Sequence, residues 1–415
     1  MRALAARLPF YYGWVVLAAL CCAGFARQGS AVATLSVFVE PLTREFGWSR
    51  AALSGAVSLG GVLAAVVSPL IGPLLDRHGS RLVLCLAVAL NGVALILLSF
   101  TPSLLVFYLL FCFARMNWAG PFDLGIYGAL NNWFVERRAL AASLATLAQM
   151  GGLVALPLVA QLAIGHGGWR GGWIAIGVLT FVVGFLPAWL FVARRPEDMG
   201  LAPDGRPAAA GSASERKLEE PSFSRAQAMR TPAFWLLLAY TVLVYPVQAG
   251  VSLHQAAHLV ERGVGAATAA SVVGFFSLMS GAGTLGGSAL ARRLPLRVVL
   301  SLIGALLAAG AFLMTRIATA ADGFVAGGVF GFGLGGMLTL LPVAWADYFG
   351  RANFGAIRGI ALSAQVLAQA AGPLFSGLLR DATGDYRASL YCFTALSLAA
   401  AGVALAARRS RASSV

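Results

Sequence analysis

Long apolar segments run through the whole chain, and they constrain its fold more than any other feature of the sequence. Nearly uncharged blocks cover residues 13–27, 82–114, 139–164, 171–193, 233–253 and 390–407. A helix needs roughly 20 mostly apolar residues to cross the hydrocarbon core of a bilayer, and these blocks meet that length. Only 11% of the 415 residues are charged, too few to cover soluble domains of this total size. The sequence therefore predicts an all-α membrane protein.

Breaks at charged residues and at Pro/Gly clusters divide the apolar sequence into twelve transmembrane helices. We expect them at residues 10–39, 50–75, 82–101, 103–131, 139–164, 170–193, 232–259, 265–291, 296–316, 322–346, 356–380 and 386–407. The one sustained polar stretch, residues 194–231, leaves six helices on each side. We therefore predict an N-terminal six-helix bundle at 1–193, a cytoplasmic linker at 194–231 and a C-terminal six-helix bundle at 232–415.

The basic residues are distributed unevenly between the two sides of the predicted membrane. If the N-terminus is cytoplasmic, the cytoplasmic segments carry 21 of the 30 basic residues, with Arg358 counted among them. This asymmetry orients membrane helices. We therefore expect both termini in the cytoplasm and the chain in the cell inner membrane. The net charge of +14 needs no nucleic-acid partner to explain it.

The two predicted bundles repeat short phrases in the same order. Leu147-Ala148-Gln149 recurs as Leu367-Ala368-Gln369, and Arg81-Leu82-Val83-Leu84 recurs as Arg297-Val298-Val299-Leu300. Two related bundles around a linker indicate an alternating-access transporter, with the solute site between the halves near the middle of the membrane. The glycine-rich stretch 327–336 indicates tight static helix packing or, alternatively, a deformable gating helix.

The loop between the second and third helices carries the most specific motif. It reads Gly72-Pro73-Leu74-Leu75-Asp76-Arg77-His78-Gly79-Ser80-Arg81 and resembles the G-x-L-x-D-R-x-G-R-[KR] signature of the major facilitator superfamily, with Ser80 where a basic residue is usual. The resemblance implies a pseudo-symmetric twelve-helix fold. It also implies a cytoplasmic conformational latch made by Gly72, Asp76, Arg77, Gly79 and Arg81. The second half lacks the matching acid, so we expect the latch to be one-sided.

Several phrases resemble one branch of this superfamily, the monocarboxylate transporters and oxalate:formate antiporters. They are Tyr11-Tyr12-Gly13-Trp14, Phe46-Gly47-Trp48-Ser49-Arg50, Asn132-Trp133-Phe134-Val135-Glu136-Arg137-Arg138, Arg195-Pro196-Glu197-Asp198-Met199-Gly200-Leu201 and Tyr348-Phe349-Gly350-Arg351. The resemblance implies transport of a small organic anion, a monocarboxylate, by proton symport or by exchange for a counter-anion. Members of the branch carry a basic residue in helix 8, but residues 271–290 of this chain contain no charge.

Charges inside predicted helices are the strongest candidates for solute contact, because an arginine at mid-membrane costs roughly 2.5 to 3.5 kcal/mol on the translocon scale. Arg27 and Arg115 lie in the first and fourth helices, which line the central cavity in this superfamily. We interpret Arg27 as an anion receptor, a structural ion pair or a snorkelling side chain, with Thr34 on the same helical stripe. Arg115 is a substrate contact, a structural residue or a proton-coupling residue. Asp123 exchanges protons or pairs with an arginine.

Polar side chains in the second half complete the set of candidates. His254, which we expect to be the deeper of the pair formed with His258, is a candidate for proton coupling and substrate contact. Tyr245, Gln248 and Gln365 are candidate substrate contacts, and helix–helix hydrogen bonds explain them equally well.

Other functional classes find little support in the sequence. The chain contains no GxSxG, P-loop or HExxH motif, and its cysteines form no CxxC pair, so we predict no enzymatic activity, cofactor or metal. The uncharged helix 8 leaves efflux of amphipathic or toxic compounds as an alternative, and a non-transporting sensor as a third. We expect the protein to act as a monomer in the bilayer.

Overall fold

The computed structural model describes residue 5 and residues 7–205 and 223–409, and most of them are helical. Residues 206–222 of the predicted linker lie outside the described residues. The first half contains α2 (Gly13–Arg27), α3 (Val32–Phe46), α4 (Arg50–His78), α5 (Ser80–Leu98), α6 (Leu104–Ala119), α7 (Pro121–Trp133), α8 (Arg138–Leu179) and α9 (Leu186–Phe191), with the short turns η1 (Gln28–Ser30), η2 (Thr180–Phe185), η3 (Glu197–Met199) and η4 (Pro203–Gly205). The second half contains α10 (Arg225–Met229), α11 (Pro232–Glu261), α12 (Ala266–Ala291), α13 (Leu296–Thr315), α14 (Ala320–Phe349), α15 (Phe354–Thr383) and α16 (Arg387–Ala406).

The helices have the length and apolarity that a membrane requires. Eleven helical segments of the described chain are long and apolar enough to span a bilayer. One of them, Arg138–Phe191, runs through Gly167 and Gly168, whose backbone angles are not helical, so it consists of two helices. Counted in this way, the described segments account for the twelve helices predicted from the sequence.

Two of the predicted helices are broken near their middle. The first is interrupted at Gln28–Ser30, between α2 and α3, and Ala31 between the turn and α3 is extended. The fourth is interrupted at Gly120, because α6 ends at Ala119 and α7 starts with Pro121. Proline suits the first position of a helix because its missing N–H would have no partner there. Helix breaks of this kind leave backbone groups for side chains to bind.

The described chain forms two compact units. Unit 1 comprises Met1–Ser222 and Gly350–Ser363, and unit 2 comprises Phe223–Phe349 and Ala364–Val415. The N-terminal part of α15 therefore groups with the first six helices, although in sequence it lies within the second set of six. The division expected from the sequence, at 194–231, assigns this segment to the C-terminal bundle.

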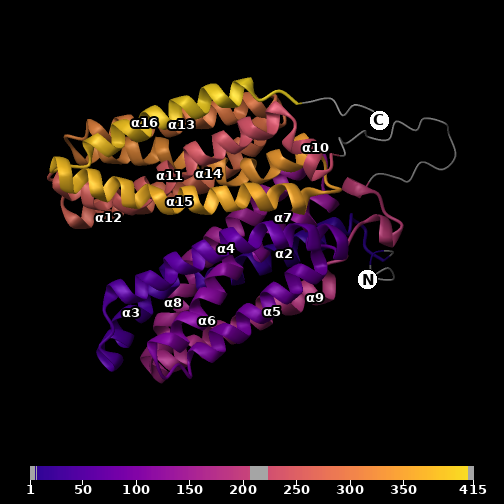
Figure 1. Ribbon diagram of the computed structural model, residues 1–415, viewed down its shortest axis with the longest axis horizontal. Helices are drawn as coiled ribbons and strands as arrows, with labels where there is room; N and C mark the ends of the chain where they lie inside the picture. Colours follow the sequence, from indigo (N-terminus) through magenta and orange to yellow (C-terminus); the bar gives the residue numbers. More distant parts are fainter. Residues whose placement is uncertain (1–4, 6, 206–222, 410–415) are drawn as a thin grey trace. The chain divides into compact units, whose positions relative to one another are not determined.

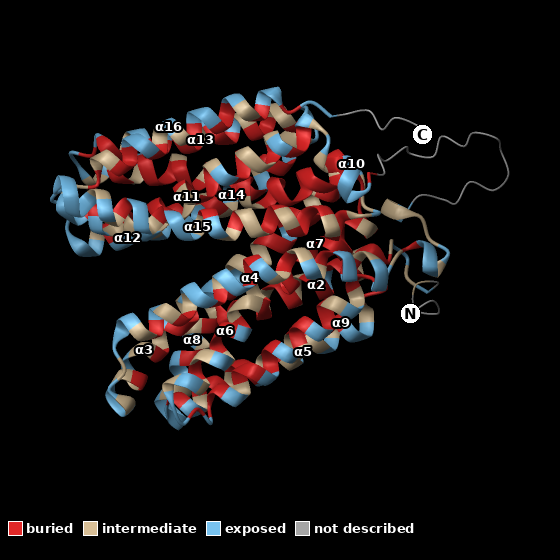
Figure 2. Cartoon of the chain, in the orientation of Figure 1, coloured by how far each residue is buried: buried red, intermediate tan, exposed pale blue. Residues whose placement is uncertain are grey.

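Each unit is a bundle of helices (Figure 1), in which buried residues line the interior and exposed residues lie outside (Figure 2). The buried residues are mostly apolar. In unit 1, α2 and α5 pack against α8, and α4 packs against α6. In unit 2, α14 packs between α12 and α13, and α13 packs against α16. Large apolar side chains also point outward, for example Leu70, which is 65% exposed, and Leu278, which is 68% exposed. An extensive apolar surface of this kind is typical of a face that contacts lipid.

Candidate functional site

Arg27 lies at the C-terminal end of α2, inside unit 1. Its side chain is 6% exposed. Its Nε donates to the carbonyl oxygen of Trp118 over 2.8 Å, and its Nη1 donates to Oε1 of Gln149 over 2.9 Å. The same Nη1 lies 3.7 Å from Oδ1 of Asp123. Arg27 is therefore paired in this structure, and its role as an anion receptor stays a prediction.

The two helix breaks explain why these groups meet. The carbonyl of Trp118 is among the last of α6, where carbonyls lack intrahelical partners, so it is available to Arg27. Asp123 lies in the first turn of α7, and Arg27 lies in the last turn of α2. An acid at a helix N-terminus and a base at a helix C-terminus are each stabilised by the helix dipole. The broken helices therefore place opposite charges where each is favoured.

Arg115 stands beside this pair on α6. Its Cζ lies 3.9 Å from the ring centroid of Trp118, and the Cζ of Arg27 lies 4.6 Å from the same centroid. The stem of Arg115 rests on Gly60, where a methyl group would come within 2.6 Å of the Arg115 Cβ. Nε and Nη1 of Arg115 are buried and have no hydrogen-bond partner among the described residues. Both guanidinium groups therefore lie close to the Trp118 ring. That of Arg115 has N–H groups that can donate to a ligand.

Arg358 is a third arginine of this site, and the sequence did not indicate it. It lies on α15 in the part that groups with unit 1, and its side chain is 0% exposed. Its Nη2 lies 3.5 Å from Oδ2 of Asp123. The sequence counted Arg358 only among the basic residues of the cytoplasmic segments, and the structure shows that it is buried beside an acid. One available signal was its position two residues inside the predicted range of helix 11.

Thr34 does not continue a stripe with Arg27. The break at Gln28–Ser30 separates the two residues, and the Thr34 hydroxyl donates to the carbonyl oxygen of Gln28 over 2.7 Å. The Gln28 side chain accepts a bond of 3.3 Å from the Trp118 indole. In this structure Thr34 supports the break on which the arginine site depends.

The motif at the C-terminal end of α4 makes a second contact with the N-terminal part of α15, and its residues 72–78 are helical rather than part of a loop. The carboxylate of Asp76 accepts from the backbone N–H of Gly355 over 2.8 Å and from that of Ala356 over 2.7 Å. Gly72 allows this approach, because a methyl group there would overlap the carbonyl oxygen of Gly355. Asp76 therefore binds the first N–H groups of a helix, an arrangement that the helix dipole stabilises.

The remaining motif residues contact α9 and the residues that follow it. Gly79 has a φ of +90° and leaves room for the stem of Arg194, whose Nη2 donates to the carbonyl oxygen of Arg77 over 3.2 Å. Arg81 donates to the carbonyl oxygen of Trp189 over 2.8 Å and lies over its ring.

The other predicted solute contacts belong to unit 2. Gln248 accepts a hydrogen bond of 3.2 Å from Gln369, the helix–helix bond that the sequence left open. Tyr245 and Gln365 are buried. They belong to unit 2, and their participation in the arginine site of unit 1 stays a prediction.

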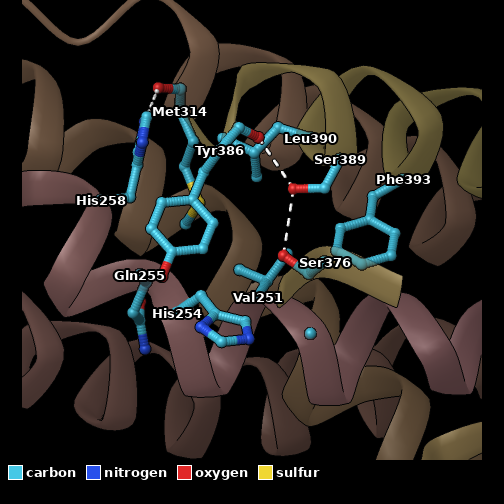
Figure 3. A pocket seen from close by; sticks show the side chains of 11 residues that line it. Val251, His254, Gln255, His258, Met314, Ser376, Tyr386, Ser389, Leu390 and Phe393 are labelled. Atoms are coloured by element: carbon cyan, nitrogen blue, oxygen red, sulfur yellow. Dashed lines mark hydrogen bonds between the residues drawn. The ribbon is translucent and has the colours of Figure 1, made fainter. Parts of the chain in front are cut away.

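A small pocket in unit 2 lies between α11, α13, α15 and α16 and contains both histidines of α11 (Figure 3). Nε2 of His254 is 3.2 Å from the carbonyl oxygen of Pro373, and Nε2 of His258 is 2.8 Å from that of Met314. A carbonyl only accepts, so each Nε2 carries a hydrogen and each Nδ1 of a neutral ring is an acceptor.

The two histidines differ in exposure. His258 is 2% exposed, whereas His254 is only partly buried. His258 is the more enclosed of the two because it faces α13, and the expectation that His254 lies deeper in the membrane stays a prediction. Nδ1 of His258 and both amide atoms of Gln255 lack partners among the described residues, and a water molecule would satisfy them. Within that part of the chain, no group of three His, Cys, Asp or Glu side chains is placed to hold a metal ion.

Comparisons with known proteins agree with this architecture. The family model described as Major Facilitator Superfamily matches residues 16–330. The transporter FucP, solved in its outward conformation, superposes with a TM-score of 0.74 at 11% identity, covering 96% of this chain and 100% of its own.

Two curated relatives are more similar in sequence. Monocarboxylate transporter 11 of Mus musculus is 27% identical over 391 residues, which are 91% of this chain and 83% of the relative. The membrane sensor protein UhpC of Salmonella typhimurium is 30% identical over 213 residues, which are 49% of this chain and 47% of the relative.

Proposed function

The chain belongs to the major facilitator superfamily and is a secondary transporter, and we propose that its substrate is a small organic anion of the monocarboxylate class. The observation that carries the proposal is Arg115. Two of its buried nitrogens have no partner among the described residues, and its guanidinium shares the Trp118 ring with Arg27. Buried charges are costly unless they are paired, so a cation kept in this state favours an anionic ligand.

A carboxylate has the chemistry that this arrangement requires. Its two oxygens match the fork of a guanidinium and form charge-assisted hydrogen bonds with it. Gln149 and Trp118 orient Arg27 through its Nη1 and Nε, so this receptor is held in place before a ligand arrives. A ligand with one carboxylate and a short apolar body would also fit against the Trp118 ring. The 27% identity to a monocarboxylate transporter over most of the chain supports the same class.

The test is transport of radiolabelled lactate, pyruvate and acetate into proteoliposomes, measured as uptake under a pH gradient and as counterflow. We expect Arg115→Gln to lower kcat/KM by about tenfold or more, because a hydrogen bond to a charged group contributes roughly 1.5 to 3 kcal/mol. Arg170→Gln is the matched control, since Arg170 pairs with Glu45 at an exposed position. Equal transport by Arg115→Gln and the parent protein would remove Arg115 from the site.

Two alternative functions have their own signatures. Helix α12 covers residues 266–291 and contains no charged residue, which favours efflux of amphipathic compounds. Broad drug resistance on overexpression without carboxylate transport would identify that function. The similarity to a protein named as a membrane sensor covers about half of the chain. A monocarboxylate that binds but is never translocated would identify a sensor.

A further inference from the structure

Two side chains connect the arginine site to the Asp76 contact. Asp123 presents Oδ1 to Arg27 at 3.7 Å and Oδ2 to Arg358 at 3.5 Å. Arg358 lies within one helical turn of Gly355 and Ala356, the residues whose N–H groups donate to Asp76. A continuous set of contacts therefore runs from Arg27 to the start of α15, all of it within unit 1.

We propose that Asp123 and Arg358 couple occupancy of the anion site to the strength with which unit 1 holds residues 350–363. The proposal rests on the monocarboxylate function proposed above. In the ligand-free site, Asp123 supplies countercharge to Arg27. A bound carboxylate takes over this role, because it forks onto the guanidinium at hydrogen-bond distance whereas Asp123 lies at 3.7 Å.

When the ligand displaces Asp123 from Arg27, the carboxylate of Asp123 interacts with Arg358 and is no longer shared with Arg27. The Arg358 side chain is fully buried, and an arginine in such surroundings is costly without its acid. A carboxylate that is no longer shared pairs more strongly with the remaining cation. Anion binding therefore strengthens the attachment of residues 350–363 to unit 1.

The same residues reach the other unit through the chain itself. Helix α15 continues without interruption from the unit 1 segment into Ala364–Thr383, which belongs to unit 2. Both units contribute residues to α15. Stronger binding of its first turns by unit 1 therefore restrains the whole helix more firmly. Coupling of this kind is reciprocal. A residue that changes the attachment of residues 350–363 to unit 1 therefore also changes the affinity for the anion.

This reciprocity predicts for each variant whether lactate binds more tightly or more weakly. Asp123→Asn removes the internal competitor for Arg27, so lactate should bind about fivefold or more tightly, while net transport slows because the hold no longer responds. Arg358→Gln leaves Asp123 to Arg27 alone, so lactate should bind about fivefold or more weakly. The double variant should bind as Asp123→Asn does, since Arg358 acts through Asp123. A purely structural role for these residues would weaken binding in all three.

The experiment measures equilibrium binding of labelled lactate and initial uptake rates with purified, reconstituted full-length protein. Arg358→Lys keeps the charge and should restore affinity toward that of the parent protein. Arg170→Gln, which removes an exposed arginine from unit 1, should leave affinity and rate unchanged. Weaker binding by Asp123→Asn, or unchanged binding by Arg358→Gln, would overturn the proposal.

Hydrogen exchange separates this inference from the proposed function. If the parent protein binds no monocarboxylate, the proposed substrate class is wrong. The link from Asp123 to Arg358 is then judged without ligand, by amide exchange of the peptide covering residues 350–363. Both single variants should exchange this peptide faster than the parent and the Arg170→Gln control, and equal exchange rates would refute the link.

Discussion

The guanidinium groups of Arg27, Arg115 and Arg358 differ in the polar groups around them. Arg27 is held by a carbonyl, an amide oxygen and a carboxylate. Arg358 is fully buried against the other oxygen of the same carboxylate. Arg115 has a ring beneath it and two buried nitrogens without partners among the described residues. Asp123 faces two of these arginines, and its role in proton coupling stays a prediction, as does that of His254.

We expect His254 to carry that coupling. Histidine changes its charge near physiological pH, and His254 is more accessible than His258. In His254→Gln, acceleration of lactate uptake by an inward proton gradient should fall about tenfold, toward the rate without a gradient, because the amide cannot bind the proton. Lactate counterflow at equal pH should persist.

The control for this prediction is His166→Gln, which changes an exposed histidine of unit 1. It should respond to the proton gradient as the parent does. Full acceleration by His254→Gln would leave anion exchange, or coupling through another group, as the mode of transport.

At the scale of helices, α12 and α14 approach each other through glycine. A methyl group on Gly335 would overlap the carbonyl oxygen of Ser280, and one on Gly283 would overlap that of Phe332. Small residues allow membrane helices to pack backbone to backbone. The glycine-rich stretch 327–336 thus shows the tight packing that was one of its two interpretations, and a gating role for α14 stays a prediction.

Gly335→Ala should lower the stability of the protein. The added methyl group must displace backbone rather than a flexible side chain, and overpacking of this kind costs about 1 to 3 kcal/mol. Thermal unfolding in detergent, followed by tryptophan fluorescence, measures the loss. Gly274→Ala is the matched control, because that helical position of α12 faces open space. It should be neutral or slightly stabilising, since alanine favours helices. Equal melting temperatures for the two variants would contradict the packing argument.

At the scale of the whole molecule, the chain is a multi-pass membrane protein with an all-helical major facilitator fold. Its two units are built on the same principle, since each has an apolar core and an apolar outer surface. The fold gives the protein its class of activity. In our proposal, the substrate is recognised chiefly by a few polar side chains in unit 1.

The distribution of basic residues predicts that both termini are cytoplasmic. Epitope tags fused to residues 1 and 415 should therefore be cleaved by protease in inside-out vesicles and protected in intact spheroplasts. A tag inserted after Gly263, in the loop between α11 and α12, should show the opposite pattern. Cleavage of either terminal tag in intact spheroplasts would reverse the proposed orientation.

The sequence alone determined the helices and the family. Apolar length, glycine and proline breaks and the spacing around Asp76 are local properties, so they could be interpreted without knowing which helices touch. The same local reasoning identified Arg27, Arg115 and Asp123, because a charge inside an apolar segment is visible wherever it packs.

Only the tertiary structure decided which groups these charged side chains contact. The interruptions at Gln28–Ser30 and Gly120 depend on side chains from other helices that bind the freed backbone groups. The burial of Arg358 depends on Asp123, far away in sequence, and no periodicity within α15 encodes that partner. Pairing across large separations is set by packing, and for that reason the third arginine of the site became visible only in three dimensions.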